Sequence, residues 1–226
     1  MLRLNYLYSF IAGAVTVLAF APYELEFIPF ATVAFLFYQW RNVTSREAAK
    51  IGYFFGLGLM GVGVFWLHVS IAKFGGVTLL LAMLLALLFA AVVALYYALS
   101  GWLSVWLVER YRLNKVVSLI IVFPSVLVLA EILRAYFLTG FPWLSLGYSQ
   151  SASPLVGIAP VAGVFAVSWL VALLAGLAVL LVAGLLKQRI GALIAILSIA
   201  GTSYGLTSIQ WTEPSGDELS ARIVQG

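Results

Sequence analysis

The sequence predicts an all-α polytopic membrane protein with about seven transmembrane helices. Composition supports this class, because 64% of the 226 residues are hydrophobic and only 9% are charged, against roughly half and a quarter in soluble domains. Hydropathy and charge placement support it too, because apolar stretches alternate with short turns in which Lys and Arg gather. The predicted spans are residues 4–20, 28–40, 51–71, 77–108, 116–138, 154–186 and 190–209.

The first two spans differ in length. Residues 4–20 end at a Pro-containing loop, residues 21–27. Residues 28–40 would extend only about 20 Å as a helix, less than the roughly 30 Å hydrocarbon core. We therefore expect neighbouring helices or a locally thinned bilayer around this segment.

The third and fourth spans are rich in glycine and in aromatic residues, respectively. Gly52 and Gly56 of residues 51–71 form a small-xxx-small pair, which permits close approach of another helix. Residues 77–108 would be about 48 Å long, so this helix must tilt or project beyond the bilayer. Its second half carries four aromatic residues of the kinds that anchor helices at a membrane interface: Tyr96, Tyr97, Trp102 and Trp106.

The fifth and sixth spans contain helix-disturbing residues. Pro124 lies within residues 116–138, and we expect a kink that neighbouring helices accommodate. Pro160 and Gly163 lie near the start of residues 154–186 and predict a bend there.

The seventh span and the tail complete the chain. Residues 187–189 make a tight turn into residues 190–209, and the tail ends in a short strand-like run, residues 221–226. We therefore expect a seven-helix transmembrane domain over residues 1–211 and a linker over residues 212–226.

The basic residues predict the orientation. With a cytoplasmic N-terminus, nine of the 12 Lys and Arg residues lie on the cytoplasmic side: Arg3, Arg41, Arg46, Lys50, Arg110, Arg112, Lys115, Lys187 and Arg189. Lys73 and Arg222 lie on the other side, and Arg134 lies within a span. The positive-inside rule then predicts that the N-terminus is inside, the C-terminus is outside, and residues 68–76 share the outer face with residues 139–153.

Composition also limits the kinds of partner and reactive site that this chain can have. The net charge is only +4 and the basic residues sit in short loops, so nucleic acid is not an expected partner. The absence of cysteine excludes disulfides, thiolate metal sites and a cysteine nucleophile within this chain. The single His68 leaves no metal cluster, and we expect no metal or cofactor.

The most informative stretch is residues 123–148. An apolar helix pattern there carries Glu131 and Arg134, and the i, i+3 spacing places the two charges on one face, where they can neutralise each other. The helix then meets Gly140, which can adopt a left-handed conformation, and Pro142, which cannot continue a helix. An ion pair, a helix end and the interfacial aromatic residue Trp143 are therefore expected close together.

Two roles for the charged pair stay open at this point. An intramembrane Glu–Arg pair can simply tie two helices together. Alternatively, Glu131 and Arg134 position the following loop or contact lipid.

The motifs in this stretch carry a family resemblance. Glu131-x-x-Arg134, then Thr139-Gly140-Phe141-Pro142-Trp143 and Leu146-Gly147-Tyr148, resemble the bacterial apolipoprotein N-acyltransferase family. The runs Leu18–Tyr23 (LAFAPY), Trp66–Ile71 (WLHVSI) and Phe74-Gly75-Gly76 match in family order, and residues 221–226 are similar to the opening strand of the family's nitrilase-like domain.

The resemblance implies a protein of the bacterial inner membrane that takes part in lipoprotein maturation. Such an enzyme moves an acyl chain from a phospholipid donor to the N-terminal amine of a diacylglyceryl-cysteine lipoprotein. In the family, a periplasmic nitrilase-like domain supplies a Glu–Lys–Cys triad, in which Glu acts as general base, Cys as nucleophile and Lys as oxyanion stabiliser. This chain departs from that pattern, because it has no Cys and ends at Gly226. No catalytic residue is therefore expected in it, and the nitrilase-like domain is expected in cis beyond Gly226 or in trans.

The remaining candidate residues have two readings each. Phe141 and Trp143 either form the floor beneath the catalytic domain or contact substrate. Lys73, close to His68 at the outer interface, either snorkels or meets a phospholipid phosphate. Two other classes of protein also remain: a small-molecule or lipid transporter, suggested by kinked spans and an intramembrane pair, and a non-catalytic anchor for a separate partner.

Overall fold

The computed structural model describes residues 2–137, 140–213, 215–216 and 220–224, and the regular structure in these residues is helical. The longer helices are α1 (Leu2–Thr16), α2 (Ile28–Trp40), α3 (Ser45–Gly63), α4 (Leu67–Gly75), α5 (Leu79–Tyr111), α7 (Phe123–Tyr136), α8 (Ala159–Ala183) and α9 (Leu186–Thr207). The short helical turns are η1 (Val17–Ala19), α6 (Lys115–Val117), η2 (Ser118–Val122), η4 (Leu146–Gln150) and η5 (Pro154–Ile158). The predicted all-α class is confirmed.

The helices identify a multi-pass membrane protein. Four helical stretches of the described residues are long and apolar enough to cross a membrane: Leu79–Tyr111, Lys115–Tyr136, Pro154–Ala183 and Leu186–Thr207. The bent pair α3–α4 makes a fifth, while Leu4–Ala19 and Ile28–Trp40 are apolar but shorter. Seven crossings and the sides of the two termini therefore stay predictions.

The third predicted span is not one continuous helix. Residues 51–71 divide into the end of α3 and most of α4, which meet at an angle of 56°. Gly61 and Gly63 lower the helix propensity just before the break, and Val64 then leaves the helical region with φ −114° and ψ 9°. The sequence predicted one apolar span here and did not predict the break within it.

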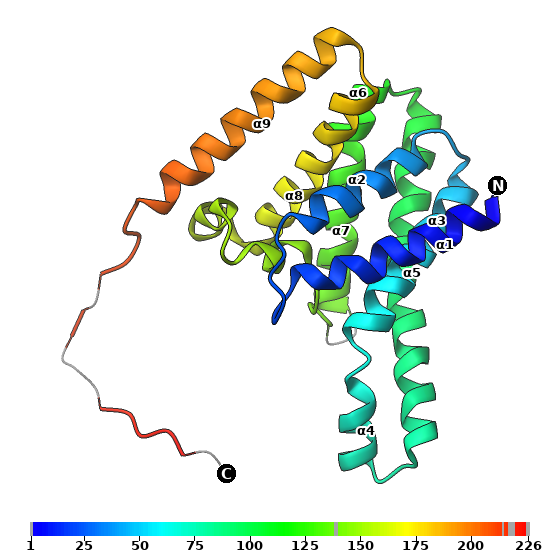
Figure 1. Cartoon of the computed structure of the whole chain (residues 1–226), viewed down its shortest axis with the longest axis vertical. Helices are drawn as coiled ribbons and strands as arrows, with labels where there is room; N and C mark the ends of the chain where they lie inside the picture. The colour runs from blue at the N-terminus through cyan, green and yellow to red at the C-terminus, as the bar shows by residue number, and fades with distance from the viewer. Residues whose placement is uncertain (1, 138–139, 214, 217–219, 225–226) are drawn as a thin grey trace.

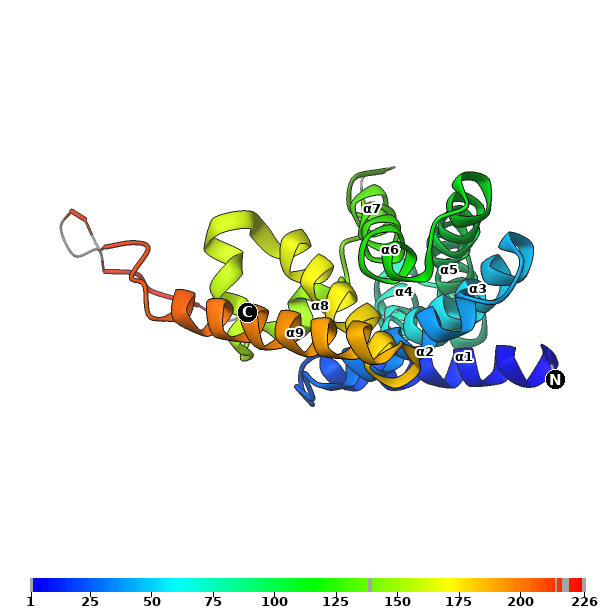
Figure 2. The ribbon, with the colours of Figure 1, turned by 90° about the horizontal axis from the view of Figure 1, so that it is seen from above.

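α3 lies between α1 and α5 and packs closely against both. Gly52 and Gly56 face α5 at Tyr97: a Cβ atom on Gly52 would overlap the Tyr97 carbonyl oxygen, and one on Gly56 would overlap the Tyr97 side chain. The predicted close approach at this glycine pair is confirmed. The helices are not all parallel, because α5 and α7 run along the viewing direction of Figure 2 while α1 lies across them.

The helices depart from regular α-helical geometry near the prolines of the fifth and sixth spans, and a kink at Pro124 itself stays a prediction. Pro124 has no N–H group to bond the carbonyl of Ile120, and a π-helical turn, η2, ends at Val122, two residues before it. In α8, Gly163 adopts φ 78° and ψ 175° and breaks the helix, which confirms the predicted bend.

The two ends of the helices differ. The turns from α5 to α6 and from α8 to α9 lie at one end, and the tip of the α4–α5 hairpin lies at the other (Figure 1). The tail extends away from the helices (Figure 1). Residues 221–224 form no strand, contrary to the prediction, and residues 225–226 lie outside the described part. A strand needs a partner for its backbone hydrogen bonds, and none lies beside these residues in the described part of the chain.

Candidate functional site

The chain reverses sharply after α7. Gly140 adopts φ +79°, and a Cβ atom there would overlap the carbonyl oxygen of Ala135, so the predicted left-handed glycine is confirmed. The Phe141 amide then donates to the Arg134 carbonyl at 2.8 Å, which turns the loop back onto the helix. Residues 138 and 139, including Thr139 of the predicted motif, lie outside the described residues.

Arg134 holds this loop through its main chain. The guanidinium is buried, with 2% of the residue exposed. Its Nη1 donates to the Phe141 carbonyl at 2.7 Å and also to the Trp143 carbonyl. Its Nη2 donates to Ser145 Oγ at 3.0 Å. One side chain therefore fixes the loop at three positions, a geometry that suits the fork-shaped guanidinium.

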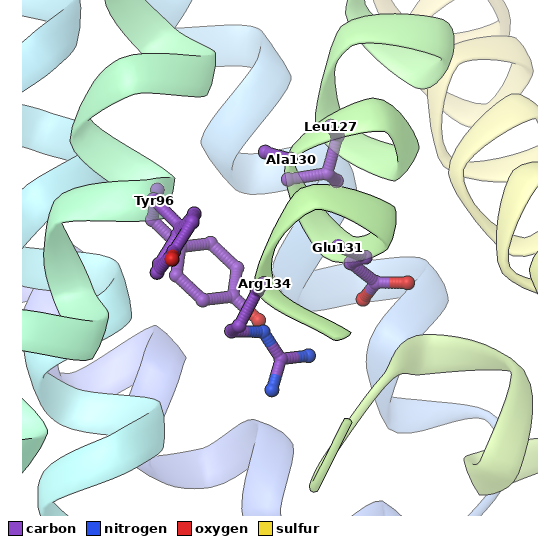
Figure 3. A pocket seen from close by; sticks show the side chains of 6 residues that line it. Tyr96, Leu127, Ala130, Glu131 and Arg134 are labelled. Carbon is purple, nitrogen blue, oxygen red and sulfur yellow. The ribbon is translucent and has the colours of Figure 1, made fainter. Parts of the chain in front are cut away.

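Glu131 binds the next part of the same loop. Its Oε1 accepts a hydrogen bond from the Leu146 amide at 2.9 Å. Glu131 and Arg134 form no ion pair within 4.0 Å, and Lys50–Glu47 is the ion pair found at that distance among the described residues. Figure 3 shows the two side chains leaving α7 in different directions.

The predicted direct neutralisation is therefore wrong, although both residues do share the loop-facing side of α7. The i, i+3 spacing leaves the side chains about 60° apart around the helix, and each reaches a different acceptor or donor in the loop. On the α5 side, Tyr96 and Tyr97 line the same small space as the two charged residues (Figure 3). Glu131 and Arg134 thus form hydrogen bonds with the loop rather than an ion pair with each other.

Leu144, between the residues held by Arg134, has an unusual backbone conformation. Its φ is +57°, which costs a side-chain-bearing residue about 1–2 kcal/mol. The residue is 7% exposed, and its side chain packs where a Cβ atom on Gly63 of α3 would lie. Hydrogen bonds on both sides and burial against α3 together stabilise this conformation.

A pocket of about 480 Å³ opens beside the loop, a volume within the range of small-molecule sites. Trp66 and Trp143 are about half exposed at 46% and 51%, and their ring centroids lie 5.9 Å apart. Three chain segments far apart in sequence contribute the lining: Val17, Phe20, Ala21, Gly63, Trp66, Pro142, Trp143, Leu144 and Tyr148. All three segments carry motifs that the sequence analysis singled out.

Five of the seven predicted site residues lie at this loop, in three groups. Pro142 and Trp143 line the pocket. Phe141 supports it from behind, since its ring stacks on Trp143 at 6.0 Å between centroids and meets Phe89 edge-on at 4.9 Å. Glu131 and Arg134 hold the loop.

His68 and Lys73 lie elsewhere, on α4, and neither lines this pocket. His68 Nδ1 contacts the Phe65 carbonyl. Lys73 is exposed, with its Nζ 5.5 Å from the Phe74 ring centre. Within the described residues, no group of three His, Asp or Glu side chains could hold a metal ion.

Sequence reasoning missed two serines that complete the site. Ser145 Oγ accepts from Arg134 and donates to the Pro142 carbonyl at 2.9 Å. Ser168 of α8 is fully buried, and its Oγ accepts from the Gly147 amide at 2.7 Å. The sequence did offer one signal for Ser168, because it is a polar residue within the apolar sixth span.

Comparison with known proteins points in one direction. Residues 12–177 match the family described as "Apolipoprotein N-acyltransferase N-terminal domain". The chain is similar to proteins named "Apolipoprotein N-acyltransferase": it is 42% identical over 217 residues to that of Methylococcus capsulatus, covering 95% of this chain and 42% of the relative.

Two further relatives carry the same name. The Coxiella burnetii protein is 39% identical over 224 residues, covering 99% of this chain and 46% of the relative. The Pseudomonas putida protein is 37% identical over 217 residues, covering 95% and 43%. The chain thus spans less than half the length of these relatives.

Proposed function

The chain belongs to the apolipoprotein N-acyltransferase family, and we propose on that basis that it forms the membrane part of an enzyme of lipoprotein maturation. The enzyme transfers an acyl chain from a phospholipid to the N-terminal amine of a diacylglyceryl-cysteine lipoprotein. The chain has the N-terminal membrane domain of the family. In this proposal it lies in the bacterial inner membrane with the loop of residues 140–145 on the periplasmic side.

The pocket beside this loop carries the proposal. Its walls are aromatic and apolar and lie where α3 and α7 end, and two half-exposed tryptophans flank it. Such amphipathic rings favour the headgroup level of a bilayer. A volume of about 480 Å³ suits the ester region of one lipid, whose acyl chains can extend along the exposed apolar helix faces.

The bond-making chemistry is assigned to a nitrilase-like domain, in cis or in trans. Acyl transfer through a thioester needs a thiol nucleophile, and this chain has no Cys. The residues of this chain instead have a positioning role: Glu131 and Arg134 fix the loop, and Pro142 and Trp143 form the lipid-facing wall.

The test compares the chain with a full-length enzyme that carries this membrane domain. Purified in detergent with phospholipid and a diacylglyceryl peptide, this chain alone should give no N-acyl product. In the full-length enzyme, Trp143→Ala should lower kcat/KM at least about fivefold, because an aromatic contact that substrate buries is worth about 1–3 kcal/mol. Trp102→Ala is the control, since Trp102 is also exposed, at 40%, and does not line the pocket.

Two results would contradict the proposal. Turnover by the chain alone would place the chemistry in residues assigned here to positioning. Equal kcat/KM in the Trp143→Ala enzyme and its control would remove the pocket from substrate binding.

A further inference from the structure

A second pocket, of about 330 Å³, lies at the end of the helices opposite to the α4–α5 tip. It is bounded by the end of α2, the end of α5 and the start of α6, where the short turns gather (Figure 1). Three charged side chains line it: Arg41, Glu109 and Lys115. None of these residues belongs to the lipid pocket described above.

Among the described residues, the two cations of this pocket have no carboxylate partner within ion-pair distance. Neither Arg41 nor Lys115 forms an ion pair within 4.0 Å in the described part of the chain, although Glu109 lines the same pocket. The Arg41 guanidinium lies 3.8 Å above the Tyr38 ring, and its Nε is buried without a hydrogen-bond partner among the described residues. Two positive charges therefore face one carboxylate across the pocket, and neither is paired with it.

Two further groups at this pocket can donate hydrogen bonds. Trp40 is 1% exposed, lines the pocket, and its Nε1 has no partner among the described residues. The 22-residue helical stretch Lys115–Tyr136 also begins here, with Asn114 Oδ1 capping the Val117 amide at 3.0 Å. The start of a long helix carries partial positive charge and free amides, which favour an anion.

We propose that this pocket binds the phosphate group of an anionic phospholipid. Arg41 and Lys115 supply the charge, the indole N–H of Trp40 supplies a fixed donor, and the helix start adds its dipole. The floor is apolar, with Val105 and Phe123 among its residues. A volume of about 330 Å³ admits a phosphate with its glycerol. The pocket lies at the ends of two helical stretches that are long and apolar enough to cross a membrane, which is where the phosphates of a bilayer are expected. These features favour a lipid headgroup over free phosphate.

The experiment measures lipid binding to the purified chain in detergent. Phosphatidylglycerol, diacylglycerol and inorganic phosphate are titrated separately, with retained ligand counted by native mass spectrometry and stability followed by thermal unfolding. Phosphatidylglycerol should be retained and should raise Tm. Diacylglycerol, which lacks the phosphate, and inorganic phosphate at the same concentration should do neither.

Matched variants locate the site. The double variant Arg41→Gln/Lys115→Gln should bind phosphatidylglycerol about 30-fold more weakly, since each cation near a membrane surface contributes about fivefold. Arg46→Gln/Arg110→Gln removes the same charge from residues at the same end that do not line the pocket, and should change binding less than twofold. Trp40→Phe keeps an aromatic ring but removes the N–H, and should weaken binding severalfold without abolishing it.

Each titration is compared with the unliganded baseline of the same variant, so a loss of stability alone does not imitate a loss of binding. Equal weakening in the two double variants would show diffuse attraction and overturn the proposal. Equal retention of diacylglycerol would show an apolar site, and equal stabilisation by inorganic phosphate would show a free-anion site; either result would also overturn it.

Discussion

Arg134 acts on the main chain of the loop rather than on any side-chain carboxylate. Burying a guanidinium is costly unless its N–H groups are satisfied. Here three loop acceptors bond Nη1 and Nη2 and offset part of that cost, while Nε has no hydrogen-bond partner among the described residues. Lysine could not replace it, because an ammonium group is a point charge without the guanidinium's planar fork. The function of this residue is thus set by geometry as much as by charge.

Arg134→Met should lower the free energy of unfolding by about 3–5 kcal/mol, since it orphans two carbonyls and leaves Glu131 buried without a nearby cation. Arg134→Lys should fall between this variant and the wild type. Arg189→Met is the control: Arg189 also donates to two carbonyls, those of Gly184 and Val182, but in an exposed position, so its loss should change Tm little. Thermal unfolding of the purified chain provides the measurement.

The double variant Glu131→Gln/Arg134→Met separates loop fixation from mutual neutralisation. If the two side chains only compensated each other, removing both charges would restore stability. The structure predicts no such recovery, because the carbonyls of Phe141 and Trp143 stay unpaired in either variant. A double variant as stable as the wild type would refute the loop-fixing role.

At the scale of elements, α3 depends on its glycines for its place between α1 and α5. Substitution of Gly52 brings a methyl group against a backbone carbonyl of Tyr97, which cannot rotate away. Gly61, on the same helix, has open space within 4 Å of the point where a methyl group would lie. An alanine substitution would therefore clash with a neighbouring helix at Gly52 and have free space at Gly61.

Gly52→Ala should destabilise the chain by about 1–3 kcal/mol through overpacking. Gly61→Ala should leave stability unchanged or raise it by up to about 1 kcal/mol, because alanine is the better helix former. Thermal unfolding of the two variants side by side provides the comparison. A Gly52→Ala chain as stable as the Gly61→Ala chain would contradict the close helix contact.

The elements were largely predictable from the sequence, and the loop contacts were not. The second span, residues 28–40, coincides with α2 because Pro29 and Arg41 mark its ends. The break at Val64 escaped prediction, because glycine content lowers helix propensity without fixing where a bend falls. The carbonyl oxygens that accept hydrogen bonds from Arg134 were not predicted either. Every residue has a backbone carbonyl, so the residue types do not indicate which carbonyl will accept. Ion pairing was predicted instead, because charge is visible in the sequence and main-chain direction is not.

At the scale of the whole molecule, the two ends of the helices have different chemistry. The short turns at one end hold most of the basic residues, and the proposed lipid pocket with its tryptophans lies away from those turns. This separation agrees with the positive-inside rule. With the predicted orientation, the two proposed pockets are expected in opposite leaflets.

The orientation can be tested by reporter fusion. Alkaline phosphatase fused after Gly226 should be active, because that position is predicted to be periplasmic, and a fusion after Asn114 should be inactive. Both fusions need equal expression, checked by immunoblot. The reverse activities would invert the assignment of both pockets to their leaflets.

The hold of Arg134 on carbonyl oxygens has a consequence for how this site can change over evolution. A carbonyl is present whatever side chain a residue carries, so exchanging Trp143 would change the wall of the proposed lipid pocket while the path of the loop is kept. The path of the loop backbone and the side chains that line the pocket can therefore change independently. If the proposed function holds, relatives with a different lipid preference are expected among sequences that keep Glu131 and Arg134 and vary the pocket-lining residues of the loop.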